Sequence, residues 1–266
     1  MANFRLPGPL CTVLRLSGPL CTVLGRLEAD AGTLSRSASP IPGPVGPQAT
    51  PPPLAPTLQK ESPAATAATP VVKLTDTDFR MAAATLGPGV SVAIIRAFAE
   101  VESGGKSGFG PAGKPIIAYE GHTFRKLTNH AHDEQYPLLS YKYVTKAGPE
   151  WKLNNKDQET AWKTLAQAMA LDRSAALQSC SWGMFQVMGF NFRDCGYSSI
   201  DDFVAAMSAG ERGQLDAFVG YCRKKAGMVA ALKANNFVAM ATLYNGKDFG
   251  DYDKKIARAY KKYGGT

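Results

Sequence analysis

Two glutamates near the end of an apolar segment are the first candidates for chemistry. Residues 94–105 read IIRAFAEVESGG, so Glu100 and Glu102 stand just before a serine and two glycines. Helical residues four apart share a face, and Glu102 therefore continues the apolar stripe of Ile95 and Phe98. We expect burial there to raise the pKa of Glu102. A raised pKa keeps a carboxylic acid protonated near neutrality, as a general acid requires.

Glu100 is predicted to have a different role from Glu102. It lies four residues after Arg96 on the polar side of the same helix, where a solvated ion pair is expected. Ser103 and the two glycines should end the helix, because glycine readily takes the left-handed conformation of a C-cap. Alone, this pattern is also typical of an ordinary capped helix. A catalytic interpretation needs further groups.

A second segment combines polar and apolar groups unusually. Residues 179–191 read SCSWGMFQVMGFN, with Gly183 and Gln186 among bulky side chains. Both residues are unfavourable inside a buried helix, because glycine costs entropy and a buried amide needs partners. A glutamine in an apolar wall can bind hydroxyl or N-acetyl groups of a sugar. A bend with an internally hydrogen-bonded glutamine is the structural alternative.

A third segment, ATLYNG at 241–246, ends an apolar helix with an aromatic ring and an amide. Tyr244 and Asn245 are residue types common in sugar-binding sites, although Asn-Gly is also an ordinary helix-ending turn. Alone, this segment does not distinguish the two interpretations.

Taken in order, these segments resemble the lysozyme-like superfamily, and most closely the N-acetylmuramidase family of phage endolysins. The family pattern is A-E-V-E-S-G-G, then F-E-G-H, then S-W-G-L-F-Q-I-M-G-F-N, then Y-N-G. It corresponds to residues 99–105, 119–122 (YEGH), 181–191 and 244–246. The resemblance covers roughly residues 73–263. Departures are Tyr119, where phenylalanine is common, and Cys180, where a small apolar residue is more usual.

The resemblance implies hydrolysis of the β-1,4 bond between N-acetylmuramic acid and N-acetylglucosamine in peptidoglycan. Glu102 would protonate the glycosidic oxygen, and Ser103 would steady the loop or the carboxyl group. Glu120 is the candidate second catalytic carboxylate. A strand-end salt bridge, or a binding role in a one-glutamate mechanism, is the alternative for it. The other predicted substrate-binding residues are Gln186, Tyr244, Asn245, Trp182, Phe185 and His122.

The elements that must position these residues are mostly helical. Apolar periodicity and capping residues predict helices at 74–87, 89–105, 157–171, 199–225, 228–246 and 251–263. Residues 114–124 predict one short strand with a turn. The expected fold class is therefore mainly α, of the α+β lysozyme-like type, with one small β element.

Residues 73–266 are predicted to form the catalytic domain, preceded by two segments of different composition. Ten of the 18 prolines fall within residues 31–70. Residues 31–72 are therefore expected to be a disordered, extended tether rich in Pro and Ala. Residues 1–30 contain an apolar near-repeat, LPGPLCTVL and LSGPLCTVL. Its prolines and Arg15 disfavour an export signal, and no apolar run is long enough for a transmembrane helix.

The net charge of +8 narrows the class of partner. Residues 1–72 contribute +2 (five basic against three acidic side chains), which leaves +6 for the globular part. Such a charge favours polyanions. We predict peptidoglycan as the partner, no nucleic acid, a monomeric state, and possible peripheral contact with anionic membrane or lipopolysaccharide. Residues of one basic stretch would make that contact: Lys254, Lys255, Arg258, Lys261 and Lys262.

The remaining sequence features predict no cofactor and no metal site. Residues 129–134 (NHAHDE) bring two histidines and an aspartate together, but no metal-binding motif is present and a polar loop is expected. The five cysteines contain no C-x-x-C, which favours reduced thiols, although a Cys180–Cys195 or a Cys195–Cys222 bridge stays open. We expect synthesis in the host cytoplasm and action on the periplasmic wall after release. A lytic transglycosylase and a non-catalytic wall-binding module are the rival functions.

Overall fold

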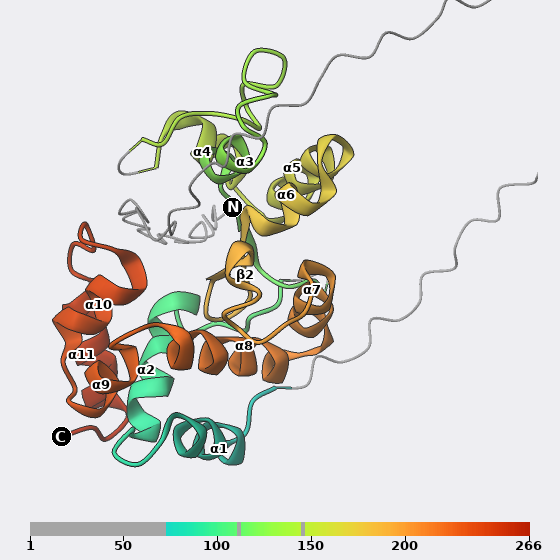
Figure 1. The fold of residues 1–266 in the computed structure, drawn as a ribbon. Helices are drawn as coiled ribbons and strands as arrows, with labels where there is room; N and C mark the ends of the chain where they lie inside the picture. The colour runs from blue at the N-terminus through green and yellow to red at the C-terminus, as the bar shows by residue number, and fades with distance from the viewer. Residues whose placement is uncertain (1–72, 111–112, 145–146) are drawn as a thin grey trace, which may run out of the picture. The chain divides into compact units, whose positions relative to one another are not determined.

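The computed structural model describes residues 73–110, 113–144 and 147–266 (Figure 1). The predicted near-repeat at 1–30 and the tether at 31–72 lie outside the described residues. The described residues therefore belong to the predicted catalytic domain, residues 73–266.

Helices dominate the described ranges, as the sequence predicts. The helices are α1 (Asp76–Leu86), α2 (Val92–Ser103), α3 (Gly121–Leu127), α4 (Pro149–Asn154), α5 (Gln158–Leu171), α6 (Arg173–Gln178), η1 (Gly189–Asn191), α7 (Ile200–Ala209), α8 (Glu211–Lys224), α9 (Met228–Lys233), α10 (Phe237–Asn245) and α11 (Tyr252–Lys262). The strands are β1 (Ile117–Tyr119), β2 (Cys180–Trp182) and β3 (Val187–Met188). Strand β2 pairs antiparallel with both others in the order β1-β2-β3. The mainly α fold class with a small sheet is confirmed.

Two segments predicted as single helices are each divided in the structure. Residues 199–225 form α7 and α8, separated by Gly210, whose backbone leaves the helical region with φ 157° and ψ 173°. Residues 228–246 form α9 and α10, separated at Asn235, which has a left-handed φ of 50°. Glycine and asparagine have low helix propensity and tolerate such conformations, which explains both breaks.

The sheet is larger than the single strand that the sequence predicts. Strand β1 covers only residues 117–119 of the predicted segment, because α3 begins at Gly121. Strands β2 and β3 form a hairpin whose turn contains Gly183 and Gln186, both at positive φ (69° and 48°). A tight turn thus explains Gly183. The bend that the sequence allowed as an alternative for this segment is present.

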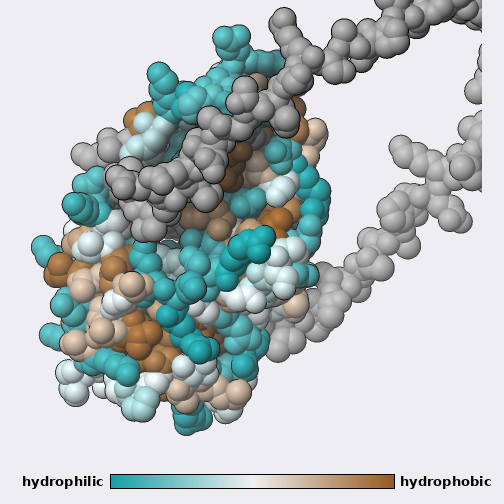
Figure 2. All heavy atoms as spheres, viewed as in Figure 1, coloured by the Kyte–Doolittle hydropathy of each residue, from teal (hydrophilic) through white to brown (hydrophobic). Residues whose placement is uncertain are grey.

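Helix α2 lies within the core and carries its C-terminal glutamate to the edge of that core. Ile94, Ile95, Ala97 and Phe98 have no exposed surface. Helices α1 and α11 both pack against α2, and α8 packs against α1 and α7. Sheet residues contact α5, which also packs on α6. In the same view, Figure 2 shows hydrophilic residues over much of this face and a smaller apolar patch near α2 and α9.

The cysteines in the described residues lie within the core. Cys180, Cys195 and Cys222 are all buried, and none forms a disulfide. Burial raises the pKa of Cys195 to about 12 and that of Cys222 well above its usual value. Their thiols therefore stay protonated and unreactive in the folded protein. Separately, none of the helices in the described ranges has the length and apolar character needed to cross a bilayer.

Candidate active site

Glu102 occupies the last turn of α2, as the apolar stripe predicts. Ser91 caps the start of the helix, where its hydroxyl accepts a hydrogen bond from the Ile94 amide, and Gly104 caps its end in the left-handed conformation. Glu102 itself is only 6% exposed. A carboxyl group is thus held at the margin of the core by a helix with defined ends.

Tyr252, the first residue of α11, donates its hydroxyl hydrogen to Oε1 of Glu102. Burial and then the neighbouring Glu102 raise the pKa of Tyr252 well above its usual value. The phenol therefore stays protonated over the whole physiological range, and it can donate to Glu102 throughout. The position of the Glu102 carboxyl group thus depends on the C-terminal helix.

Asn245 and Tyr244, at the end of α10, adjoin this pair. Within the described part of the chain, Nδ2 of Asn245 is buried and has no hydrogen-bond partner. The amide still lies close enough to Tyr252 to counteract part of the rise in that phenol's pKa. The Tyr244 ring stacks nearly parallel to the Tyr252 ring, with centroids 6.5 Å apart. The structure therefore brings the predicted residues Tyr244 and Asn245 to the surroundings of Glu102.

Gln186 lies in the β2–β3 turn, and its amide braces that turn. Its Oε1 accepts a hydrogen bond from the Ser181 hydroxyl (2.8 Å), and its Nε2 donates to the Gly183 carbonyl (2.8 Å). The turn is joined to the site through the Tyr244 hydroxyl, which donates to the carbonyl of Phe185 (2.7 Å). The Gln186 amide is therefore hydrogen-bonded within the protein, which is the structural alternative that the sequence left open. Because Phe185 directly precedes Gln186 in the chain, the Tyr244 hydrogen bond also places Gln186 close to the group around Glu102.

Three other predicted site residues make contacts within the protein: Trp182, Phe185 and Ser103. Trp182 and Phe185 have no exposed surface; the first donates to the Leu177 carbonyl and the second stacks on Phe218 with centroids 4.5 Å apart. As buried side chains they line the core rather than an open wall. The Ser103 hydroxyl donates to the Ala99 carbonyl (2.6 Å), a contact within α2.

Glu100 forms an ion pair, but with a residue other than the expected Arg96. Glu100 accepts hydrogen bonds from Lys262 Nζ and from the Tyr263 hydroxyl, both at 2.6 Å. Arg96 instead pairs with Asp76. The prediction of a pair between Arg96 and Glu100 was wrong, because α11 packs along α2 and brings its own charges to that face.

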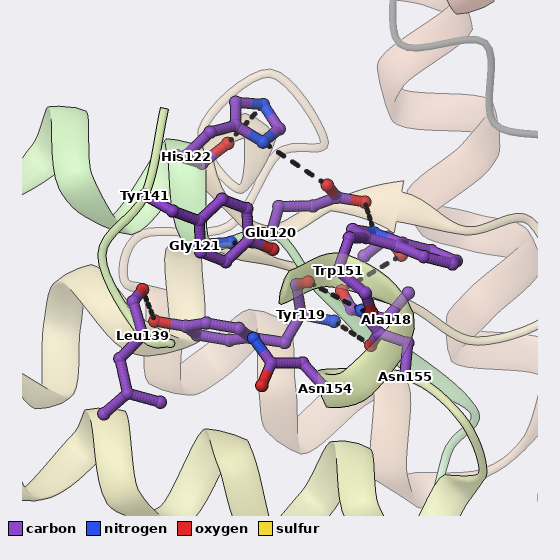
Figure 3. Close-up of polar contacts among 12 residues, drawn as sticks. Ala118, Tyr119, Glu120, Gly121, His122, Leu139, Tyr141, Trp151, Asn154 and Asn155 are labelled. Atoms are coloured by element: carbon purple, nitrogen blue, oxygen red, sulfur yellow. Dashed lines mark hydrogen bonds and ion pairs between the residues drawn. The ribbon is translucent and has the colours of Figure 1, made fainter. Parts of the chain in front are cut away.

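Glu120 lines a hollow that does not include Glu102. Figure 3 shows the polar contacts around Glu120. It is the N-cap residue of α3 and is only 2% exposed. Trp151 Nε1 donates to its Oε1 (3.1 Å), and His122 Nδ1 lies 3.5 Å from its Oε2. The Tyr141 hydroxyl accepts the Gly121 amide at 3.1 Å. The structure thus joins the predicted residues Glu120 and His122, whereas Glu102 is grouped with Tyr252 and Asn245.

The histidine-rich loop contacts the residues on either side of it in the chain. Asp133 accepts hydrogen bonds from Arg125 (2.7 Å) and from the Ser140 hydroxyl (2.6 Å), and His132 stacks on Phe124. Across the described ranges, no cluster of three or more His, Cys, Asp or Glu side chains could hold a metal ion. The loop at 129–134 is therefore accounted for by its own hydrogen bonds and ring contacts.

Sequence analysis missed Tyr252 and Trp151, the residues that hold the two glutamates. A signal for Tyr252 was present. Tyr252, Ile256, Ala259 and Tyr260 follow helical spacing and are all buried, but the charges of this segment masked its apolar stripe. Trp151 offered no comparable signal, since its contact with Glu120 spans 31 positions between two short helices.

A mostly helical fold with a small sheet, and a buried glutamate at a helix end, fit the lysozyme-like class of glycoside hydrolases. The model of the family described as Muramidase: N-acetylmuramidase matches residues 91–264, and the chain belongs to this family. A solved structure, that of a Burkholderia AP3 phage endolysin, is 37% identical. The match covers 72% of this chain and 70% of that one, with a TM-score of 0.60. No curated protein matched. The chain is accordingly a cell-wall hydrolase of the endolysin type.

Proposed function

We propose that this chain is an N-acetylmuramidase that hydrolyses the β-1,4 bond between N-acetylmuramic acid and N-acetylglucosamine, with Glu102 as the general acid. The observation that carries the proposal is the buried Glu102 carboxyl group, oriented by Tyr252 at the end of α2. The family match and the likeness to a phage endolysin support the same polymer as substrate.

In this proposal, Glu102 transfers its proton to the glycosidic oxygen as the N-acetylglucosamine leaves and the muramic acid ring gains oxocarbenium character. Water then adds to the anomeric carbon and gives one proton to the Glu102 carboxylate, which restores the acid. The Tyr252 hydrogen bond stabilises the Glu102 carboxylate that remains after proton transfer. The unpartnered Nδ2 of Asn245 supplies a donor for an oxygen of the bound sugar, and the Gln186 turn supports it from the side of Tyr244.

We assign Glu120 a binding role rather than that of the catalytic base. Its two carboxylate oxygens lie against Trp151 and His122, in a hollow of its own. A base would have to position the attacking water, and its loss would lower kcat. A binding residue would mainly affect KM. Replacing Glu120 with Gln and measuring kcat and KM separately distinguishes the two roles.

The test of the proposed function is mass spectrometry of digested sacculi, with wild type, Glu102→Gln and Glu100→Gln. We expect hydrated reducing ends from wild type and Glu100→Gln, and a loss of at least about 100-fold in rate for Glu102→Gln. Anhydro ends would identify a lytic transglycosylase instead. No cleavage by any of the three, with sacculi still bound, would identify a wall-binding module.

The proposal also includes the setting in which the chain acts. It would be made in the cytoplasm of the host bacterium, reach the periplasmic peptidoglycan after release, and act as a monomer. Of the five basic residues predicted to contact anionic surfaces, Lys255 and Lys262 are paired with Asp251 and Glu100. The other three residues of that set, Lys254, Arg258 and Lys261, are exposed. Salt-sensitive binding to anionic vesicles, weakened by removing those three charges, would support this contact.

A further inference from the structure

The hollow beside Glu120 combines carboxylates with aromatic rings. Its lining includes Glu120, Glu150, Tyr141, Tyr143, Trp151 and His122. Glu120 is almost completely buried, whereas Glu150 comes from the first turn of α4 and is half-buried. The His122 and Tyr143 rings meet edge to face, with centroids 5.1 Å apart. The hollow is therefore a small recess lined by two carboxylates and by aromatic rings.

Both carboxylates act on the same phenol. The pKa of Tyr141 is raised by burial and also by the charges of Glu120 and Glu150. The negative potential of the two groups therefore overlaps within the hollow. Lys142 also borders it, but this residue is exposed, and a long lysine side chain can keep its ammonium group in solvent. On a chain of net charge +8, two adjacent carboxylates create a local preference for a cation.

We propose that this hollow binds a primary ammonium group carried by the peptide part of the wall polymer. An ammonium group finds charge-assisted acceptors in Glu120 and Glu150 and ring faces in the tyrosines and Trp151. A neutral sugar hydroxyl would gain no cation–π contact with these rings. The inference rests on the proposed function, because it specifies which substituent of the same polymer is recognised.

The first test uses the full wild-type chain and two preparations of soluble, uncrosslinked glycan strands. One preparation carries stem peptides with the free side-chain amine of their diamino acid; in the other, that amine has been acetylated. We expect acetylation to raise KM about tenfold with kcat little changed. Equal KM values for the two preparations would overturn the inference. This comparison needs no variant and so cannot fail through misfolding.

A pair of variants then locates the effect. In Glu150→Gln, the ratio of the two KM values should fall toward one. In the control Glu134→Gln, which removes an exposed glutamate outside the hollow, the ratio should stay near that of wild type. An unchanged ratio in Glu150→Gln would also refute the site. If wild type cleaves neither preparation, the proposed function fails, and calorimetric Kd values for the same strands test the ammonium site independently.

Discussion

The hydroxyl of Tyr252 donates a hydrogen bond to Oε1 of Glu102, although 150 positions separate the two residues in the chain. The contact depends on the packing of α11 against α2, which also pairs Lys262 and Tyr263 with Glu100. Two glutamates of one helix turn are thus each held by a tyrosine from one end of α11. Tyr252, its first residue, holds Glu102 inside the core, and Tyr263, its C-cap, holds Glu100 at the surface. This arrangement offers a matched pair of variants.

Tyr252→Phe should lower kcat by about 10- to 100-fold, since it removes the donor that orients the Glu102 carboxyl group and stabilises its carboxylate. The fold should persist, because the ring and its packing remain. Tyr263→Phe removes the corresponding hydroxyl from Glu100 and should leave kcat within about twofold. Turnover of sacculi and the far-UV circular dichroism of both variants provide the check. Equal losses in the two variants would show that Tyr252 has no specific effect on Glu102.

The comparison of Glu102 with Tyr252 shows what the sequence could and could not predict. The burial of Glu102 followed from its place on the stripe of Ile95 and Phe98, because helical periodicity is a local property. The partner of Glu102 depends on which helix packs against α2. That choice is made by tertiary contacts, and nothing in the spacing of residues 251–263 specifies it. The same limit explains the wrong partner predicted for Glu100.

Asn245→Ala should weaken substrate binding more than it weakens the fold. Its Nδ2 has no hydrogen-bond partner among the described residues, so truncation should change the free energy of unfolding by less than about 1 kcal/mol. KM should rise about tenfold if this donor binds the sugar. Urea unfolding and steady-state kinetics measure the two effects separately.

Asn155→Ala is the matched control for Asn245. The Asn155 amide bonds both the N–H and the carbonyl of Tyr119, at 2.7 and 2.9 Å. Its removal leaves strand β1 groups unsatisfied and should cost about 2 kcal/mol of stability. If Asn245→Ala destabilised the protein as much as Asn155→Ala, its amide would be a structural group rather than a ligand donor.

Gln214→Leu should be among the more destabilising single changes in the domain, at about 3 kcal/mol. Gln214 is 1% exposed, and its amide bonds the Met184 N–H and the carbonyls of Gly108 and Met207. Leucine would leave all three backbone groups buried and unsatisfied. Gln178→Leu, at a partly buried residue whose amide bonds Ser174, should change stability by less than about 0.5 kcal/mol. Urea midpoints for the two variants test the difference.

The role of Gln214 also shows why the Gln186 segment was ambiguous in sequence. Gly183 leaves room for the Gln214 amide, since a Cβ there would meet its carbon at 2.4 Å. The glycine is needed because a residue 31 positions later fills that space. An amide among apolar residues has the same appearance in sequence whether it binds a ligand or a neighbouring backbone group. Hydrogen-bond partners distinguish the two cases, and they depend on the folded structure.

Alkaline pH should destabilise the domain, because several buried acids have pKa values above their unfolded ones. The pKa of Cys195 rises from 9.0 to about 12 and that of Tyr197 from 10.0 to about 12, in both cases chiefly through burial. Above pH 9 the unfolded state releases protons that the folded state retains. The stability contributed by these groups is therefore complete below pH 9 and is lost as pH rises toward 12. Free energies of unfolding in urea at pH 8, 9.5 and 11 should fall steadily, and Cys195→Ala should reduce the slope, by removing one of the groups. A free energy that stays constant from pH 8 to 11 would contradict this account of the buried thiol and phenols.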